Sequence, residues 1–232
     1  MPIDREKQLI FVHIPKVAGT SIEKAFNMYG DHFNSSFENA FGQYSHENET
    51  YALQHISIFQ LEKLGILQGD KLKKFYSFCF VRNPWDRAVS DFKWHRSVRN
   101  KNFKFRAYLK EALNITQQYE KNRTINYTNC HYVPQSWYIY DSEGVKGVDF
   151  IGKYESLEKD INFIMTQHKM EEVSLTNSNQ GKAIPYVFYF LDIRNIFLIS
   201  KIYREDIKNF NYTFFKSNAL KLFVSRVLKK IG

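Results

Sequence analysis

This 232-residue sequence has two cysteines and no long apolar run. Two cysteines are too few for a disulfide scaffold, and Cys79 lies within the apolar run Phe75 to Val81, which favours a buried free thiol. No stretch approaches the ~20 apolar residues of a membrane span, and no signal-like segment follows Met1. These absences favour a soluble cytoplasmic protein, or else the catalytic domain of a longer anchored one.

Metal-ligand spacing is also missing. The cysteines and histidines form no CxxC or HxxxH pair. Such pairs are typical of zinc sites, because they bring two ligands to one face of a turn or helix. We therefore expect no metal ion.

Aromatic and apolar residues, in contrast, are plentiful. They make up 17% and 44% of the chain, which excludes a disordered protein and predicts a globular core. The length suits one α/β domain over residues 1–232. The 33 basic residues outnumber the 24 acidic ones and give a net charge of +9, so the surface should attract anions such as nucleotides, acidic glycans, nucleic acid or lipid headgroups.

Apolar runs alternate with helical patterns along the chain. Strands are predicted over residues 9–13, 75–81 and 148–154. Helices are predicted from residue 20 onward and over 57–64, 84–96, 103–113, 157–168 and 196–210. Residues 31–51 and 114–129 are polar and predict irregular loops. Strands alternating with helices imply an α/β fold with a parallel sheet.

The last segment, residues 218–231, has the pattern of a basic amphipathic helix. Docking of this helix on the domain is favoured over contact with a membrane surface. The sequence does not specify an oligomeric state.

The first candidate site is the turn from His13 to Ser21, which follows a predicted strand and opens a helix. Backbone N–H groups and the helix dipole converge on anions at such a turn. Gly19 permits close approach of the backbone, Thr20 and Ser21 offer hydroxyls, and Lys16 offers a mobile cation. Lys16 lies four positions before Thr20 and a second glycine is missing, so the turn is not an ATP-binding Walker loop.

The second candidate site is the turn that follows the strand ending at Val81. Arg82 lies at the carboxyl end of this strand, where open α/β sheets bind ligands. Asn83 can cap the next helix and Pro84 suits its first position. Arg82 could fork onto a phosphate, and Ser90 could add a hydroxyl to the same anion. Two such turns fit a nucleotide that carries two separate phosphate groups.

At these residues the sequence resembles the sulfotransferases that use 3′-phosphoadenosine-5′-phosphosulfate (PAPS). HIPKVAGTS is similar to their 5′-phosphosulfate loop and VRNPWDRAVSDF to their 3′-phosphate segment, about 60 to 70 residues apart. The likeness extends to Gln54–Ser57, to the region around Glu155, and to Ile202–Asp206, and is greatest to the carbohydrate sulfotransferases, including bacterial members and the uronyl 2-O-sulfotransferases.

The resemblance implies a P-loop-like three-layer α/β fold, PAPS as donor, no metal, and a hydroxyl acceptor, chiefly a carbohydrate. The residues implied to hold the 5′-phosphosulfate are Lys16, Ala18, Gly19, Thr20 and Ser21, and those implied to hold the 3′-phosphate are Arg82 and Ser90. Val17 departs from the family, which usually has threonine there. Residues 177–182 occupy the place where the family closes a loop over the cofactor.

Sulfuryl transfer requires a cation at the departing oxygen and a proton acceptor for the hydroxyl. Lys16 is the candidate cation. His55 is the candidate base, because QHIS resembles the histidine motif that supplies the base in the 2-O-sulfotransferases, although a capping or surface role stays open. His13 and His131 are candidates for contact with the acceptor. Aromatic residues over 132–140 could stack on a sugar, or belong to the core.

Two other functions stay open. An ATP-dependent P-loop kinase is disfavoured by the missing Walker pattern. A non-catalytic module that binds nucleic acid or another polyanion fits the charge but leaves the two ordered turns unexplained. We expect no nucleic-acid partner.

Overall fold

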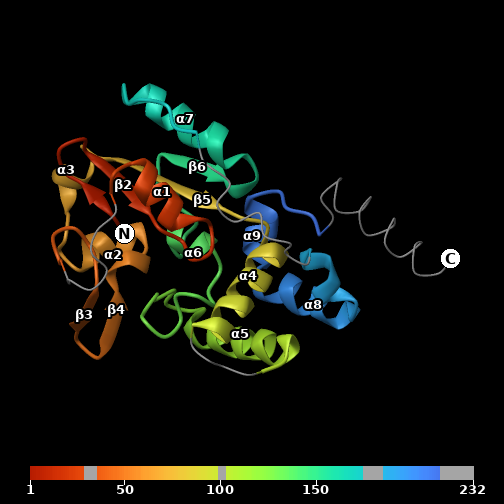
Figure 1. Cartoon of the computed structure of the whole chain (residues 1–232). Coiled ribbons are helices and arrows are strands. Elements are labelled where there is room, and N and C mark those ends of the chain that lie inside the picture. The colour runs from red at the N-terminus through yellow and green to blue at the C-terminus, as the bar shows by residue number, and fades with distance from the viewer. Residues whose placement is uncertain (29–35, 99–102, 175–184, 215–232) are drawn as a thin grey trace.

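The computed structural model describes residues 1–28, 36–98, 103–174 and 185–214. Its central sheet has the strand order β1-β2-β5-β6 (Figure 1). Strands β2 (Leu9–Val12), β5 (Tyr76–Val81) and β6 (Phe150–Lys153) run parallel, and the short β1 (Ile3–Asp4) adds an antiparallel edge. The three predicted strands are thus confirmed, whereas β1 was not predicted.

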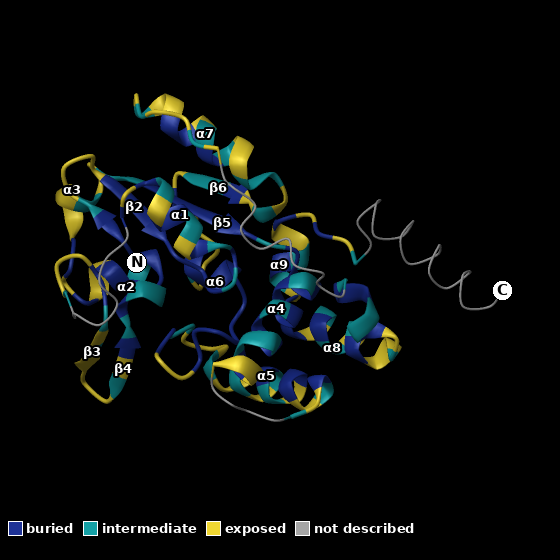
Figure 2. Ribbon diagram, in the orientation of Figure 1, coloured by how far each residue is buried: buried dark blue, intermediate teal, exposed yellow. Residues whose placement is uncertain are grey.

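The parallel strands form because their side chains are apolar on both faces of the sheet. All four residues of β2 and the last five of β5 are buried, as expected of strands covered on both sides (Figure 2). Phe78 is paired in register with Phe11 on one side and with Phe150 on the other. The predicted fold class, mixed α/β with a mostly parallel central sheet flanked by helices, is confirmed.

Helices pack on this sheet through aromatic side chains. Phe26, which ends α1 (Gly19–Ala25), lies against Phe78 with ring centroids 4.8 Å apart. Phe163 of α7 (Leu157–Gln167) stacks on Phe150 at 5.4 Å. The other helices and 3-10 turns are η1 (Leu53–His55), α2 (Ile58–Lys63), α3 (Gly69–Leu72), α4 (Pro84–Ser97), α5 (Phe105–Tyr119), α6 (Ser136–Ile139), η2 (Tyr154–Ser156), η3 (Tyr186–Phe190), α8 (Ile193–Ile202) and α9 (Arg204–Asn209).

Two helices begin as their capping residues predict. The side chain of Asn83 accepts hydrogen bonds from the backbone N–H groups of Trp85 and Asp86, and Pro84 occupies the first position of α4. Ser57 and Gln60 form a reciprocal capping box at the start of α2. Local sequence therefore determines where the helices that border the site begin.

Three predictions from the sequence were wrong in part. The stretch 31–51 overlaps a hairpin of β3 (Gln43–His46) and β4 (Glu49–Ala52), in which Tyr51 alone is buried, so the sequence lacks a clear apolar alternation. The helix α5 continues to Tyr119, six residues into the polar stretch predicted as loop. The predicted helix over 196–210 is divided at Tyr203, a buried residue whose hydroxyl donates to the carbonyl of Tyr132. The predictions for residues 177–182 and 218–231 lie outside the described residues.

The tight packing of the sheet at Gly152 gives a test of the fold. A methyl group on Gly152 would come within 2.5 Å of the Phe80 ring, so Gly152→Ala should lower the free energy of unfolding by about 1 to 3 kcal/mol, as overpacking does. Urea denaturation measures this loss. The double variant Gly152→Ala/Phe80→Leu should recover part of it, and an unchanged midpoint in the single variant would contradict the packing.

Candidate active site

The first turn leaves β2 and enters α1 through two residues in the left-handed region. Lys16 has φ of 71° and Ala18 has φ of 68°, which turns the chain sharply before the helix begins at Gly19. No side chain caps this helix start. Ala18, Gly19, Thr20 and Ser21 instead line a cavity, so the first turn of α1 faces the space where an anion would bind.

Gly19 is required by the ring of His13. A Cβ atom at position 19 would overlap the His13 imidazole, so no larger residue fits without displacing that ring. His13 is buried, and its Nδ1 lies 2.6 Å from Oε1 of Glu23 in α1. The close approach of strand end and helix start thus depends on both residues.

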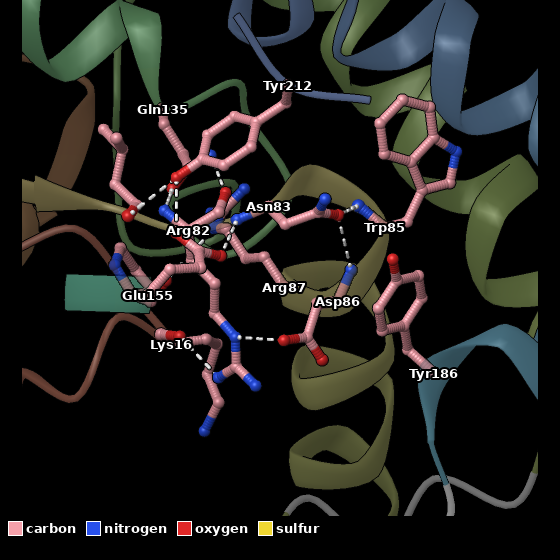
Figure 3. A network of polar contacts seen from close by, with 12 residues as sticks. Lys16, Arg82, Asn83, Trp85, Asp86, Arg87, Gln135, Glu155, Tyr186 and Tyr212 are labelled. Atoms are coloured by element: carbon pink, nitrogen blue, oxygen red, sulfur yellow. Dashed lines mark hydrogen bonds and ion pairs between the residues drawn. The ribbon is translucent and has the colours of Figure 1, made fainter. Parts of the chain in front are cut away.

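The second turn leaves β5 and enters α4. The Arg82 guanidinium donates through Nε to Asp86 and through Nη1 to the backbone carbonyl of Lys16, at 3.1 Å in both cases (Figure 3). It also lies over the ring of Tyr154, 4.1 Å from the centroid. Nη2 makes no such bond within the described part of the chain, which leaves a donor for an incoming anion.

Residues of both turns line one cavity of about 760 Å³. This volume is within the range of sites for small molecules and cofactors. All the candidate site residues of the sequence analysis line it: His13, Lys16, Ala18, Gly19, Thr20, Ser21, His55, Arg82, Ser90 and His131. The geometry therefore brings the two turns and the three histidines together, while their roles stay predictions.

Lys16 stands among other positive charges. Burial lowers the pKa of Lys16, the guanidinium groups of Arg82 and Arg87 lower it further, and Asp91 opposes them. Its ammonium lies 5.6 Å from the centroid of the Trp94 ring. Such a cluster of cations lowers the cost of bringing a multiply charged anion into the cavity.

His55 comes from the 3-10 turn η1. Its Nδ1 lies 2.9 Å from the backbone carbonyl of His13, so this nitrogen carries the proton and donates. The two rings meet edge to face at 4.6 Å. Burial, followed by the nearby His13 and His131, holds the pKa of His55 well below its usual value. His55 is therefore neutral at pH 7.

His131 faces the ring of His55, with the two ring centroids 5.7 Å apart. Its Nδ1 is 2.6 Å from Oδ1 of Asp91, and its ring stacks on Trp94 with centroids 4.1 Å apart and planes 8° apart. Asp91 and Trp94 belong to α4, nine and twelve residues after Arg82. The second turn and its helix thus supply both the predicted anion-binding side chains and the support of His131.

The sequence analysis missed Asp91, Lys93, Trp94, Tyr154 and Tyr186. Asp91 supports the wall from behind, and the other four line the cavity. Asp91 and Trp94 lie four and seven residues after Arg87, a spacing that places all three on one face of the helix. This shared face was the signal in the sequence that could have identified them. Their pairing with His131 is a long-range contact that no local pattern predicts.

Asp91, His95 and His131 form a buried group whose polar atoms lie within 4.8 Å of one another. Both oxygens of Asp91 already accept hydrogen bonds, from His131 and from the Tyr108 hydroxyl. Hydrogen bonds thus hold Asp91 and His131, whereas neither ring nitrogen of His95 has a hydrogen-bond partner among the described residues. The absence of a metal stays a prediction.

The aromatic residues over 132–140 are not arranged for stacking on a sugar. Tyr132, Trp137 and Tyr138 are almost completely buried in the core, and Tyr140 packs against it. The hydroxyl of Tyr138 donates to the Cys130 carbonyl, which satisfies it within the protein. The core alternative for this segment is therefore correct.

Comparison with known proteins decides the family. The model of the sulfotransferase family matches residues 1–213, which include both turns and every wall of the cavity. The chain belongs to the sulfotransferase family.

Individual relatives of this chain are distant. Carbohydrate sulfotransferase 10 of Rattus norvegicus is 33% identical over 121 residues, which are 52% of this chain and 32% of that protein. The same enzyme of Xenopus laevis is 22% identical over 90% of this chain and 66% of its own length. An uncharacterized protein of Archaeoglobus fulgidus is 34% identical over 45% of this chain and 77% of its own. No solved structure matches the sequence significantly. Across the ranges described above, no helix is long and apolar enough to cross a bilayer.

A substitution of Arg87 tests whether its hydrogen bonds hold the walls of the cavity together. Its buried guanidinium donates to the carbonyls of Pro15, Val133 and His131. Arg87→Met would leave three acceptors without this donor and should lower the free energy of unfolding by about 3 kcal/mol or more. Urea denaturation checks this, with the exposed Arg96→Met on the same helix as matched control. Equal midpoints for the two variants would contradict the assignment.

Proposed function

We propose that this sulfotransferase moves the sulfuryl group of PAPS to a hydroxyl acceptor by in-line displacement. The observation that carries the proposal is that Lys16 and Arg82, from turns that follow neighbouring strands, line one cavity. The family match over residues 1–213 supports one catalytic domain over residues 1–232.

The residues of the cavity fit a nucleotide with two anionic ends. Lys16 and the backbone and hydroxyl groups of residues 18–21 would hold the 5′-phosphosulfate. Arg82, through its remaining Nη2, and Ser90 would hold the 3′-phosphate. When bound, PAPS supplies the activated sulfuryl group, and the protein needs only to position it and to neutralise charge.

Lys16 has the role of neutralising the charge that develops on the departing oxygen. Its ammonium is mobile enough to follow that charge, and the neighbouring Arg82 and Arg87 stabilise an anion in the same cavity. The acceptor hydroxyl loses its proton to a histidine of the cavity wall. The sequence predicts His55 as this base, and His131 is a second candidate because it lines the same cavity.

The acceptor that we propose is a carbohydrate. The names of the rat and frog relatives support this class. The side chains of Gln54, His55 and Lys93 also line the cavity, and they suit a polar and acidic sugar. A screen with labelled PAPS against a panel of glycans, glycolipids and small alcohols would identify the acceptor.

Binding of the reaction product tests the donor. Adenosine 3′,5′-bisphosphate at 100 times its Kd should stabilise the protein by about 2.7 kcal/mol without added metal, which raises the melting temperature by several degrees. ATP with magnesium should not do so. A shift in melting temperature with ATP and magnesium, but none with the bisphosphate, would favour a kinase. Salt-sensitive DNA binding without a shift for either nucleotide would favour a polyanion-binding module.

Arg82 and Lys16 should differ in what their loss changes. Arg82→Ala removes a charged donor and should weaken product binding by about 10- to 100-fold, measured by calorimetry. Lys16→Ala should leave the fold intact and lower kcat by about 10²- to 10³-fold, because it acts on charge that develops during transfer.

Arg96→Ala, on the exposed face of α4, is the matched control for both variants. Product binding to Arg82→Ala as tight as to the control would exclude the assigned phosphate contact. Full turnover of Lys16→Ala would exclude its role at the leaving oxygen.

A further inference from the structure

His131 is held in one orientation from three sides. Asp91 accepts from Nδ1 at 2.6 Å, Trp94 stacks on the ring face, and Arg87 donates to the backbone carbonyl. Because Nδ1 carries the proton that Asp91 accepts, Nε2 is the basic nitrogen of the ring. His131 lines the same cavity as Lys16, so this nitrogen belongs to a residue beside the predicted site of transfer.

Asp91 is a buried carboxylate that stays charged. Burial alone would raise its pKa, but His131 and His95 outweigh this effect and hold the pKa far below the usual value. Tyr108 donates to the second oxygen at 2.9 Å, and His95 lies 3.3 Å from it. A fixed negative charge next to an imidazole stabilises the imidazolium that forms when the ring accepts a proton.

Among the residues that the structure describes, no carboxylate is hydrogen-bonded to the ring of His55. Its Nδ1 donates to a neutral backbone carbonyl, whereas that of His131 donates to a carboxylate. A proton accepted by His55 would also meet the nearby rings of His13 and His131, which disfavour a positive charge there. Of the two histidines, His131 is therefore better supported as a proton acceptor.

We propose that His131, oriented and charge-stabilised by Asp91, is the general base of the transfer, and that His55 positions the acceptor hydroxyl. The acceptor oxygen forms a bond to sulfur while the bond between sulfur and the bridging oxygen breaks. The proton of the hydroxyl passes to Nε2 of His131, and the electron pair of the broken bond stays on the 5′-phosphate oxygen beside Lys16. This assignment rests on the proposed function.

The pH dependence of such a base follows from the groups that face it. Asp91 raises the pKa of His131, whereas burial, His95 of α4 and Lys16 of the first turn lower it, and His55 of η1 faces the ring at 5.7 Å. Burial is the largest effect, so the pKa lies below the usual value. Below that pKa the base is protonated and kcat falls. Removing the charge of Asp91 should lower the pKa further and shift this acid limb to lower pH.

Three variants in the full chain separate the two histidines. His131→Asn keeps a donor toward Asp91 but has no base, and should lower kcat by about 10²- to 10⁴-fold. Asp91→Asn should lower kcat and shift the acid limb to lower pH. His55→Asn, the matched variant, should mainly raise the KM of the acceptor that the glycan screen identifies. All three should keep the melting-temperature shift with adenosine 3′,5′-bisphosphate.

A titration of the ¹⁵N-labelled histidine rings by NMR gives a readout that needs no turnover. The expected results are a neutral His131 protonated at Nδ1, and a lower pKa of His131 in Asp91→Asn than in the wild type. The proposal is overturned if His131→Asn keeps kcat within threefold of the wild type, or if neither the NMR titration nor the acid limb moves in Asp91→Asn. Failure of the wild type itself to transfer label to any acceptor would reject the proposed function, and this assignment with it.

Discussion

The cavity depends on one buried guanidinium. Arg87 of α4 is 2% exposed, and it donates to the carbonyl of Pro15 in the first turn and to those of His131 and Val133 in a third segment. These segments are far apart in the sequence. The first turn carries Lys16, the third segment carries His131, and the helix of Arg87 itself follows the second turn. A buried charge with its donors satisfied fixes such segments firmly, because any displacement would leave it unpaired.

The second turn is held by side chains from still later in the chain. Gln135 bonds both backbone groups of Arg82, and Glu155 accepts from the backbone N–H of Asn83 (Figure 3). Asp206 in turn fixes the backbone of Gln135, and Tyr212 donates to Glu155. The bonds from Gln135, Glu155 and Asp206 hold backbone groups, and the bond from Tyr212 orients Glu155. An anion-binding turn benefits from this, because donors that are already oriented need no reorganisation when charge arrives.

The charges of the site are arranged in two layers. Lys16 and Arg82 face the cavity, and the carboxylates of Asp86 and Asp91 lie beside or behind them. Asp86 accepts a hydrogen bond from Arg82 and so orients that cation, and Asp91 accepts a hydrogen bond from His131. The second turn and α4, whose start Asn83 determines, thus carry Arg82 and Ser90 in the cavity wall together with the carboxylates of Asp86 and Asp91.

Sequence alone was sufficient to predict the parallel strands, the capped start of α4 and the position of both strand-to-helix turns, because these follow from short apolar runs, capping residues and a glycine at local spacing. It did not predict the β3–β4 hairpin, whose short strands bury only Tyr51 and show no clear apolar alternation, or the division of α8 from α9 at the buried Tyr203. Nor did it predict that Asp91 would support His131, 40 residues away. That pairing, like the three bonds of Arg87, exists only because the sheet brings distant segments together, and long-range contacts of this kind leave no local periodicity in the sequence.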